Sequence, residues 1–377
     1  MTRKSDCNIL QSSTKVCAKN IKNPNKLAIT LKDIAEKTNC SVSTVSRVLN
    51  NKSKQYRIAE ETEKLILETA HNLNYRPNEL ARGLRLKRSH TIGLVVPDIS
   101  NPFFAYVSHL IQRHSYEAGY SLILCNTDED IDLEIEQIEL LRRKGVDGYI
   151  ILPVGTKQDH IYELLTLNKP FVLLDRIFDD IKTNAVVVDN YKGAYQAVKH
   201  LIDNGHTRIA IIQGLQNTST NNARVSGYIN ALKDHQIPLD EKLIVGNDFR
   251  KENGYIETKL LLRLEEPPTA IFTTSDLITL GTLQAISEEN KTIPKDVSLV
   301  AFDEIDYAPF LVAPLTSVRQ PRDLMGQVAV KLLIDDIKSR GTNKKERLVL
   351  DPKLILRKSV YNLRSNESEF SAVYSGY

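Results

Sequence analysis

The sequence predicts a small all-α headpiece followed by an α/β domain of two lobes with parallel sheets. Two short amphipathic patterns joined by a turn occupy residues 30–50, and from His90 onward strand-like apolar runs alternate with helical stretches. The charge divides at the same place: residues 1–90 hold 18 Lys+Arg against 8 Asp+Glu, a net of +10. The remainder holds 32 against 39, a net of −7. A chain of 377 residues is long enough for two or three domains.

The first residues are polar and show no sustained periodicity. Residues 1–29 include five Lys and one Arg among scattered Ser and Asn. Such a composition cannot bury enough apolar surface to order a segment. We therefore predict a disordered basic tail over 1–29.

The two amphipathic patterns predict a helix-turn-helix. Leu31, Ile34 and Ala35 share one face of the first helix. The second helix repeats apolar residues at helical spacing: Val42, Val45, Val48 and Leu49. The break at 38–40 has the length of a turn, and Ser41 is a good N-cap. Two short helices joined in this way form the motif.

The polar face of the second helix suits a DNA major groove. Hydroxyls can bond phosphates, and an arginine can bond a guanine edge in bidentate fashion. The predicted DNA-binding residues of this helix are Val42, Ser43, Thr44, Ser46, Arg47 and Asn50. The alternative is a helical hairpin with an ordinary polar surface. The periodic residues of a third helix over 60–73 favour a headpiece over 30–76.

A short segment over 77–90 predicts a hinge. Pro77 sets its start, Asn78 is a possible N-cap, and Gly83 weakens it as a helix. Isolated helices this short are marginal in water, so we expect helix only when the segment is docked on DNA. Its basic residues would also allow a plain linker.

Strand–helix alternation over 91–361 predicts parallel sheets covered on both faces. The strand-like runs are Ile92–Val96, Leu122–Cys125, Tyr149–Leu152, Phe171–Leu174, Ala185–Val188, Ile209–Ile212, Ala270–Thr273 and Ser298–Phe302. The helical stretches are Ala105–Ala118, Leu133–Lys144, Tyr191–Asn204, Ala223–Asp234, Gly254–Arg263, Leu277–Glu289 and Pro321–Ser339.

Three motifs, KDIAEKTNCSVSTVSRVLN, LNYRPNELARGLR and HTIGLVVPDISNPFF, occur in order from residue 32. With them the chain resembles the LacI/GalR family of lac-repressor-type transcription regulators, from Thr30 to about Val360. The resemblance implies a type I periplasmic-binding-protein-like body. It places lobe one at about 91–189 plus 321–345 and lobe two at about 190–320 plus 346–361. It also implies that Leu84 enters the DNA minor groove, and it marks the loop at 50–57 as longer than usual.

Ligands in open α/β sheets bind beyond the carboxyl ends of the strands. Aromatic faces with carboxylates and arginines suit a small hydroxyl-rich ligand. The resemblance implies these effector-binding residues: Phe103, Phe104, Asp175, Arg176, Thr220, Arg224, Phe249, Asp276 and Asp303. Asp303 and Arg224 are the pair we favour most. For each residue singly, the alternative is a strand-end cap or a structural ion pair.

The expected ligand is a sugar or sugar phosphate first and a nucleobase second. By the resemblance, purine-binding members carry an arginine at the position of Thr218, and its absence disfavours purines. The expected function is a sequence-specific DNA-binding regulator, a repressor, whose affinity for a palindromic operator is controlled by this effector. The alternatives are a small-molecule binding protein without a transcriptional role and a sugar-acting enzyme.

The sequence carries no GxSxG, P-loop, GxGxxG or HExxH motif, which disfavours an enzyme. Its four cysteines, Cys7, Cys17, Cys40 and Cys125, lack paired metal spacing, so we expect no metal and no cofactor. No apolar run predicts a signal peptide or a membrane span, and we expect a cytoplasmic protein. Residues 362–377 read as a disordered tail without leucine heptads, so a homodimer is expected.

Overall fold

A computed structural model describes residues 29–75, 88–155, 157–339 and 344–364. The chain divides into two compact units, a head within Met1–Arg82 and a body within Gly83–Tyr377. Leu84 and the predicted hinge helix lie outside the described residues, as do 1–28 and 365–377.

The head is a three-helix unit. Its helices are α1 (Leu31–Thr38), α2 (Val42–Leu49) and α3 (Glu60–Asn72). Thr30 caps α1 through a capping box with Asp33, and Ser41 caps α2. Ile34, Val45, Val48 and Ile66 are fully buried between the three helices.

Two expectations about the head need correction. Ile29, expected in the disordered tail, packs against the head core, so the ordered head begins one residue earlier. Leu65, expected on the apolar face of the third helix, is 48% exposed. Helix α3 buries Ile66 and Ala70 instead, because only a narrow stripe of this helix faces α1 and α2.

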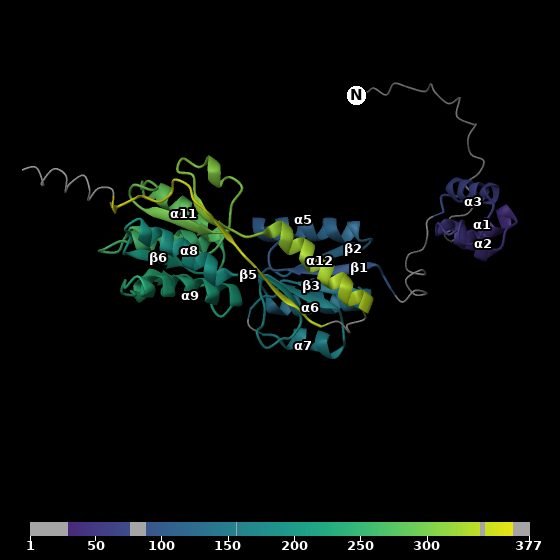
Figure 1. The fold of residues 1–377 in the computed structure, drawn as a ribbon, viewed down its shortest axis with the longest axis horizontal. Coiled ribbons are helices and arrows are strands. Elements are labelled where there is room, and N and C mark those ends of the chain that lie inside the picture. The colour runs from purple at the N-terminus through teal and green to yellow at the C-terminus, as the bar shows by residue number, and fades with distance from the viewer. Residues whose placement is uncertain (1–28, 76–87, 156, 340–343, 365–377) are drawn as a thin grey trace, which may run out of the picture. The chain divides into compact units, whose positions relative to one another are not determined.

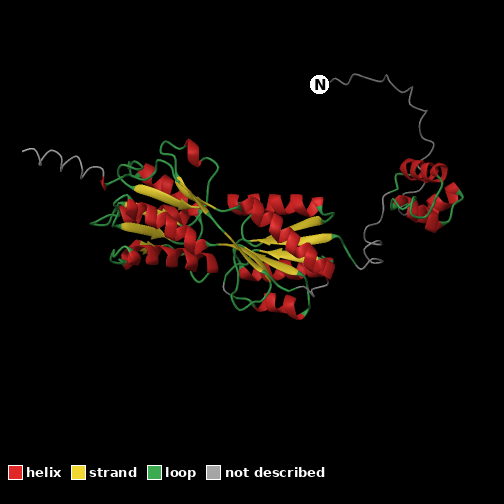
Figure 2. Cartoon of the chain, viewed as in Figure 1, coloured by secondary structure: helices red, strands yellow, loops and turns green. Residues whose placement is uncertain are grey.

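The body holds two six-stranded sheets, each with helices on both faces (Figure 2). We call them lobe one and lobe two. The strands of lobe one, in sheet order, are β11 (Arg347–Leu350), β5 (Asn184–Val188), β4 (Phe171–Leu174), β3 (Gly148–Ile151), β1 (Thr91–Val96) and β2 (Ser121–Asn126). Those of lobe two are β12 (Lys353–Ile355), β10 (Thr316–Arg319), β9 (Ser298–Phe302), β8 (Ala270–Thr273), β6 (Ile209–Ile212) and β7 (Ile244–Val245).

Every strand pair is parallel except β10 with β12. The helices of lobe one are α5 (Pro102–Glu117), α6 (Ile131–Lys144), α7 (Asp159–Thr166) and α12 (Arg322–Ser339). Those of lobe two are α8 (Asn190–Asp203), α9 (Ser219–Asp234), α10 (Lys251–Leu262) and α11 (Asp276–Glu288). This confirms the predicted α/β body with parallel sheets.

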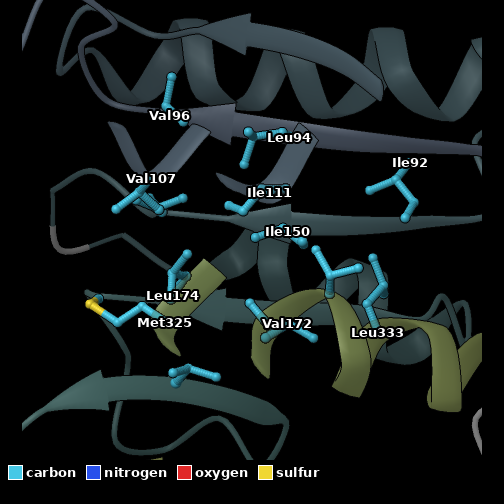
Figure 3. Packing of buried hydrophobic residues seen from close by; sticks show 14 of the residues in the cluster. Ile92, Leu94, Val96, Val107, Ile111, Ile150, Val172, Leu174, Met325 and Leu333 are labelled. Carbon is cyan, nitrogen blue, oxygen red and sulfur yellow. The ribbon is translucent and has the colours of Figure 1, made fainter. Parts of the chain in front are cut away.

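Each sheet separates two apolar layers. In lobe one, α12 places Met325 and Leu333 against Val172 and Leu174 of β4 (Figure 3). The opposite face packs on α6 and α7 through residues such as Leu141 and Ile161. Strands buried on both faces read as continuous apolar runs, which is why they were predictable.

The chain passes between the lobes three times: after β5, after β10 and after β11 (Figure 1). The expected lobe boundary at 345/346 is wrong, because β11 pairs with β5 and belongs to lobe one. The crossing instead lies between Leu350 and Lys353.

Both expected ends of the body also shift. At its start, the backbone N–H groups of Ser89 and His90 donate to Asp147 at 2.7 and 2.9 Å. These two residues, expected in the hinge, are therefore fixed on lobe one. At the other end, the Leu363 N–H donates to the Asn204 carbonyl at 2.9 Å, so residues expected in the tail are docked on lobe two.

Candidate functional site

Helix α2 presents a polar surface bounded by its own capping interactions. The Ser41 hydroxyl accepts the Thr44 N–H at 3.1 Å and lies 2.8 Å from the Ser43 and Thr44 hydroxyls. Ser43 and Arg47 are exposed, and Val42 is 41% exposed. The surface therefore offers hydroxyls at one end of the helix and a guanidinium near the other.

Two of the predicted DNA-binding residues, Ser46 and Asn50, already make a hydrogen bond within the head. The Asn50 amide donates to the Ser46 carbonyl at 2.5 Å, which satisfies an orphan carbonyl at the end of α2. Ser46 and Asn50 are both half-buried. Their first role in the structure is to close the helix, and contact with DNA remains a prediction.

All nine predicted effector residues line one cavity between the lobes. The empty space among their side chains is about 320 Å³, part of it open to solvent. Lobe one contributes Phe103, Phe104, Asp175 and Arg176, and lobe two contributes Thr220, Arg224, Phe249, Asp276 and Asp303. Asn101, Ser275 and Gln320 complete the lining.

Two aspartates occupy matching places in the two lobes. Asp175 directly follows β4, and Asp303 directly follows β9. Both have left-handed backbones, with φ of +66° and +76°. Aspartate tolerates this region better than most residues, and such conformations cluster at ligand sites. The left-handed turns end the strands with both carboxyl groups in the cavity.

The cavity raises the pKa values of its carboxyl groups. Burial raises the pKa of Asp175 to about 6, against the opposing charge of Arg224. Burial, and then repulsion from Asp303, raises the pKa of Asp276 to about 6. Burial also raises the pKa of Asp303, although Arg224 works against that shift. Three carboxyl groups are thus held where their charge is disfavoured.

Arg224 is held by partners on three sides. Its Nε donates to Asn190 at 2.8 Å, and its Nη1 donates to the Thr274 carbonyl at 2.5 Å. The guanidinium stacks on Phe302 at 3.8 Å and lies 3.9 Å from Asp303. Burial lowers the pKa of Arg224, but an arginine stays protonated at neutral pH. The side chain is a fixed cation aimed at the cavity.

Arg176 forms a bidentate ion pair with Glu129, with both N–O distances at 2.6 Å. Its guanidinium lies 5.1 Å from the Phe249 ring of lobe two. Phe249 can lie here because Gly214 faces it; a Cβ on that glycine would come within 2.1 Å of the ring. Glu129 was not predicted, because it lies in a loop and carries no periodic signal.

Three buried polar atoms at the cavity have no hydrogen-bond partner among the described residues. They are Asp175 Oδ1, Arg176 Nε and Gln320 Oε1. Leaving such an atom unpaired costs about 1–3 kcal/mol, so folded proteins rarely do so without a reason. Two acceptors and one donor suit a ligand with several hydroxyl groups.

The lobes also bond directly across the cavity. Asn101 of lobe one donates to Asp276 of lobe two at 3.2 Å. The Ile177 N–H of lobe one donates to the Ser219 hydroxyl of lobe two at 3.1 Å. Neither pair was predicted, because a sequence does not show which loops face each other. They hold the lobes together around the cavity.

Neither a membrane-spanning helix nor a metal-binding cluster occurs in residues 29–75, 88–155, 157–339 and 344–364. No helix there is both long and apolar enough to cross a membrane. No group of three or more His, Cys, Asp and Glu in those ranges could hold a metal ion.

Comparisons with known proteins agree with both units. The profile described as bacterial regulatory proteins, lacI family, matches residues 30–78. The profile described as periplasmic binding proteins and sugar binding domain of LacI family matches residues 89–358. A helix-turn-helix head and a two-lobed sugar-binding-type body define a DNA-binding transcription regulator.

The relatives are of the same class. The HTH-type transcriptional repressor PurR of Actinobacillus pleuropneumoniae serotype 3 (strain JL03) is 33% identical over 335 residues, covering 89% of this chain and 99% of the relative. The lac repressor dimer bound to operator and the anti-inducer ONPF is 25% identical with a TM-score of 0.78, covering 89% and 100%. A LacI family regulator from Enterococcus faecium with bound ribose is 34% identical with a TM-score of 0.67, covering 72% and 99%. The chain belongs to the LacI family.

Proposed function

We propose that this regulator is a homodimeric repressor whose operator affinity is set by a neutral sugar in the inter-lobe cavity. The unpaired Asp175 Oδ1, Arg176 Nε and Gln320 Oε1 are the observation that carries the choice of ligand. A sugar hydroxyl both donates and accepts, so one small molecule could satisfy all three atoms.

The charge of the cavity distinguishes among the expected ligands. Asp175, Asp276, Asp303 and Glu129 outnumber Arg176 and Arg224, which leaves an excess of negative charge. A phosphate there would meet like charges, which disfavours a sugar phosphate. Thr218 donates its hydroxyl to the Leu215 carbonyl at 2.7 Å and offers no cation to a nucleobase. A nucleobase, the second expected ligand, is the competing candidate.

The proposed mechanism links the cavity to the hinge. A ligand that bonds Asp175 in lobe one and Arg224 in lobe two fixes the angle between the lobes. Because Asp147 fixes Ser89 and His90 on lobe one, a change in that lobe's orientation in the dimer moves the start of the hinge. The two heads of the dimer would then fit, or fail to fit, the half-sites of a palindromic operator.

We propose further that the protein acts in the cytoplasm by binding alone. The relatives above are named as transcriptional repressors or regulators, and recognition of hydroxyls accounts for the buried carboxyl groups.

The test is a thermal-shift screen of the full-length protein with neutral sugars, sugar phosphates and nucleobases. A ligand at a hundredfold excess over its Kd stabilises the protein by about 2.7 kcal/mol. We expect neutral sugars to give the large shifts and to be recovered unchanged.

The thermal shift should weaken below pH 6, as Asp175 and Asp276 become protonated. Asp303→Asn should abolish it, whereas the exposed control Asp180→Asn should not. Stabilisation by nucleobases or sugar phosphates alone would contradict the proposed ligand class.

A further inference from the structure

The loop that follows α2 has a compact fold of its own. The Lys52 N–H donates to the Arg47 carbonyl at 2.9 Å, and the Ile58 N–H donates to the Ser53 carbonyl at 3.0 Å. Asn51 and Arg57 have left-handed backbones, with φ of +56° and +52°. Ser53 is buried. These hydrogen bonds hold the loop over 50–57 in one conformation, beside the C-terminal end of α2.

The returning loop brings an aromatic ring to the guanidinium of Arg47. The Cζ of Arg47 lies 4.0 Å from the centroid of the Tyr56 ring. Both side chains are exposed, and Tyr56 keeps 44% of its surface accessible. No carboxylate in residues 29–75 is within salt-bridge distance of Arg47. The ring is therefore the contact that restrains this guanidinium in the head.

Stacking and base recognition use different parts of a guanidinium. The ring touches its flat face, whereas all five N–H donors lie in its plane and point outward. A stacked arginine can still bond a guanine edge in bidentate fashion. A free arginine loses rotamer entropy when it binds, and a pre-placed one loses less.

We propose that Tyr56 is a positioning residue for base recognition, holding the Arg47 guanidinium ready for the major groove. The inference rests on the proposed role of α2 in reading DNA. The longer loop thereby has a specific task beyond the charge of Lys52, Lys54 and Arg57, which would attract phosphates of any sequence.

The experiment is a double-mutant cycle on full-length protein. Wild-type protein first selects its preferred duplex from a random-sequence library. Affinities for that duplex, and for single-base variants of it, are then measured for Tyr56→Ala, Arg47→Ala and the double variant. Tyr56→Phe keeps the ring without the hydroxyl, Tyr56→Leu keeps apolar volume without the ring, and Lys54→Ala is a control for charge.

We expect Tyr56→Ala to weaken binding to the selected duplex about 2- to 5-fold per half-site and to relax the same base pair that Arg47→Ala relaxes. In the Arg47→Ala background the Tyr56 substitution should cost nothing further. Tyr56→Phe should bind as wild type and Tyr56→Leu as Tyr56→Ala. Lys54→Ala should weaken all duplexes alike and reduce the salt dependence.

An equal loss from Tyr56→Ala in both backgrounds would overturn the proposal, because Tyr56 would then act independently of Arg47. Weaker DNA binding by Tyr56→Phe would assign the effect to the hydroxyl and so overturn the role of the ring. Unchanged DNA binding by Tyr56→Ala would likewise overturn the proposal. Failure of the wild-type protein to select any duplex would instead contradict the proposed function of the head. Thermal melting separates unfolded variants from folded ones, and Tyr56→Leu keeps the test decisive if Tyr56→Ala does not fold.

Discussion

At the scale of single residues, the carboxyl group of Asp175 lies where ionisation is costly. It is buried, one of its oxygens has no partner among the described residues, and its pKa rises to about 6. A group with a raised folded-state pKa binds more protons in the native state than in the unfolded chain. Stability is therefore lost as the pH rises from about 4 through 6. The ionised Asp175 therefore lowers the stability of the fold, and we infer that its charge is kept for binding the ligand.

Replacing this carboxyl group should stabilise the ligand-free protein. Asp175→Asn keeps the side-chain shape and tolerates the left-handed backbone. At pH 7.5 we expect roughly 1–3 kcal/mol of added stability, measured by denaturant unfolding, with loss of effector binding. Below pH 4 the gain should vanish, because the aspartate is then protonated in both states.

Asp180→Asn is the matched control on the same lobe, because Asp180 is exposed. It should change stability by less than about 0.5 kcal/mol at either pH. A destabilised Asp175→Asn at pH 7.5 would contradict the account of the buried charge.

The cavity residues divide into those that a sequence can reveal and those that it cannot. Asp175 and Asp303 could be predicted because they directly follow strands whose ends converge at one edge of a parallel sheet, whereas Arg224 was implied by the family resemblance. Glu129, Asn101 and Tyr56 gain their partners from loops whose paths depend on the folded chain. Their contacts carry no periodic signal.

At the scale of elements, burial decided what could be predicted. The eight predicted strands are buried runs of the two sheets, apart from β2, whose residues are mostly half-exposed. The short helix α7 and the strands β7, β10, β11 and β12 were missed. Strand β10 is buried, but its sequence TSVR holds a single aliphatic residue and so lacks an apolar run. Residues of β11 alternate between exposed and half-buried, so nothing in that sequence shows which sheet it joins. This explains the misplaced lobe boundary.

The cap of α2 should determine the local stability of the predicted DNA-reading surface. Ser41→Ala removes the acceptor of the Thr44 N–H and should destabilise the helix by about 1 kcal/mol. Hydrogen exchange of the α2 amides in full-length protein should then speed up about fivefold. Ser41→Asn keeps a capping oxygen and should exchange as wild type. Equal exchange in all three proteins would contradict the capping role.

At the scale of the whole body, the lobes are joined by bonds that a charge could break. Asn101→Asp keeps a good N-cap for α5 but places a second carboxylate beside Asp276, whose partner oxygen is 3.2 Å from the Asn101 amide. We expect a larger radius of gyration in solution scattering and weaker effector binding at pH 7.5. At pH 5 the variant should differ less from wild type in both measurements, because the raised pKa of Asp276 leaves that carboxyl group largely protonated.

Asn101→Ser retains a capping hydroxyl without adding charge and serves as the control. It should leave the radius of gyration close to that of wild type. An Asn101→Asp protein as compact as wild type at pH 7.5 would show that a second carboxylate beside Asp276 does not open the lobes.

One titration tests most directly whether a ligand in the cavity changes the affinity of the protein for its operator. Full-length protein is titrated into its selected duplex with and without a saturating amount of the sugar that stabilises it most. The account predicts a change in operator affinity of about 5- to 150-fold, lost in Asp303→Asn. An affinity unchanged by the saturating sugar would contradict it.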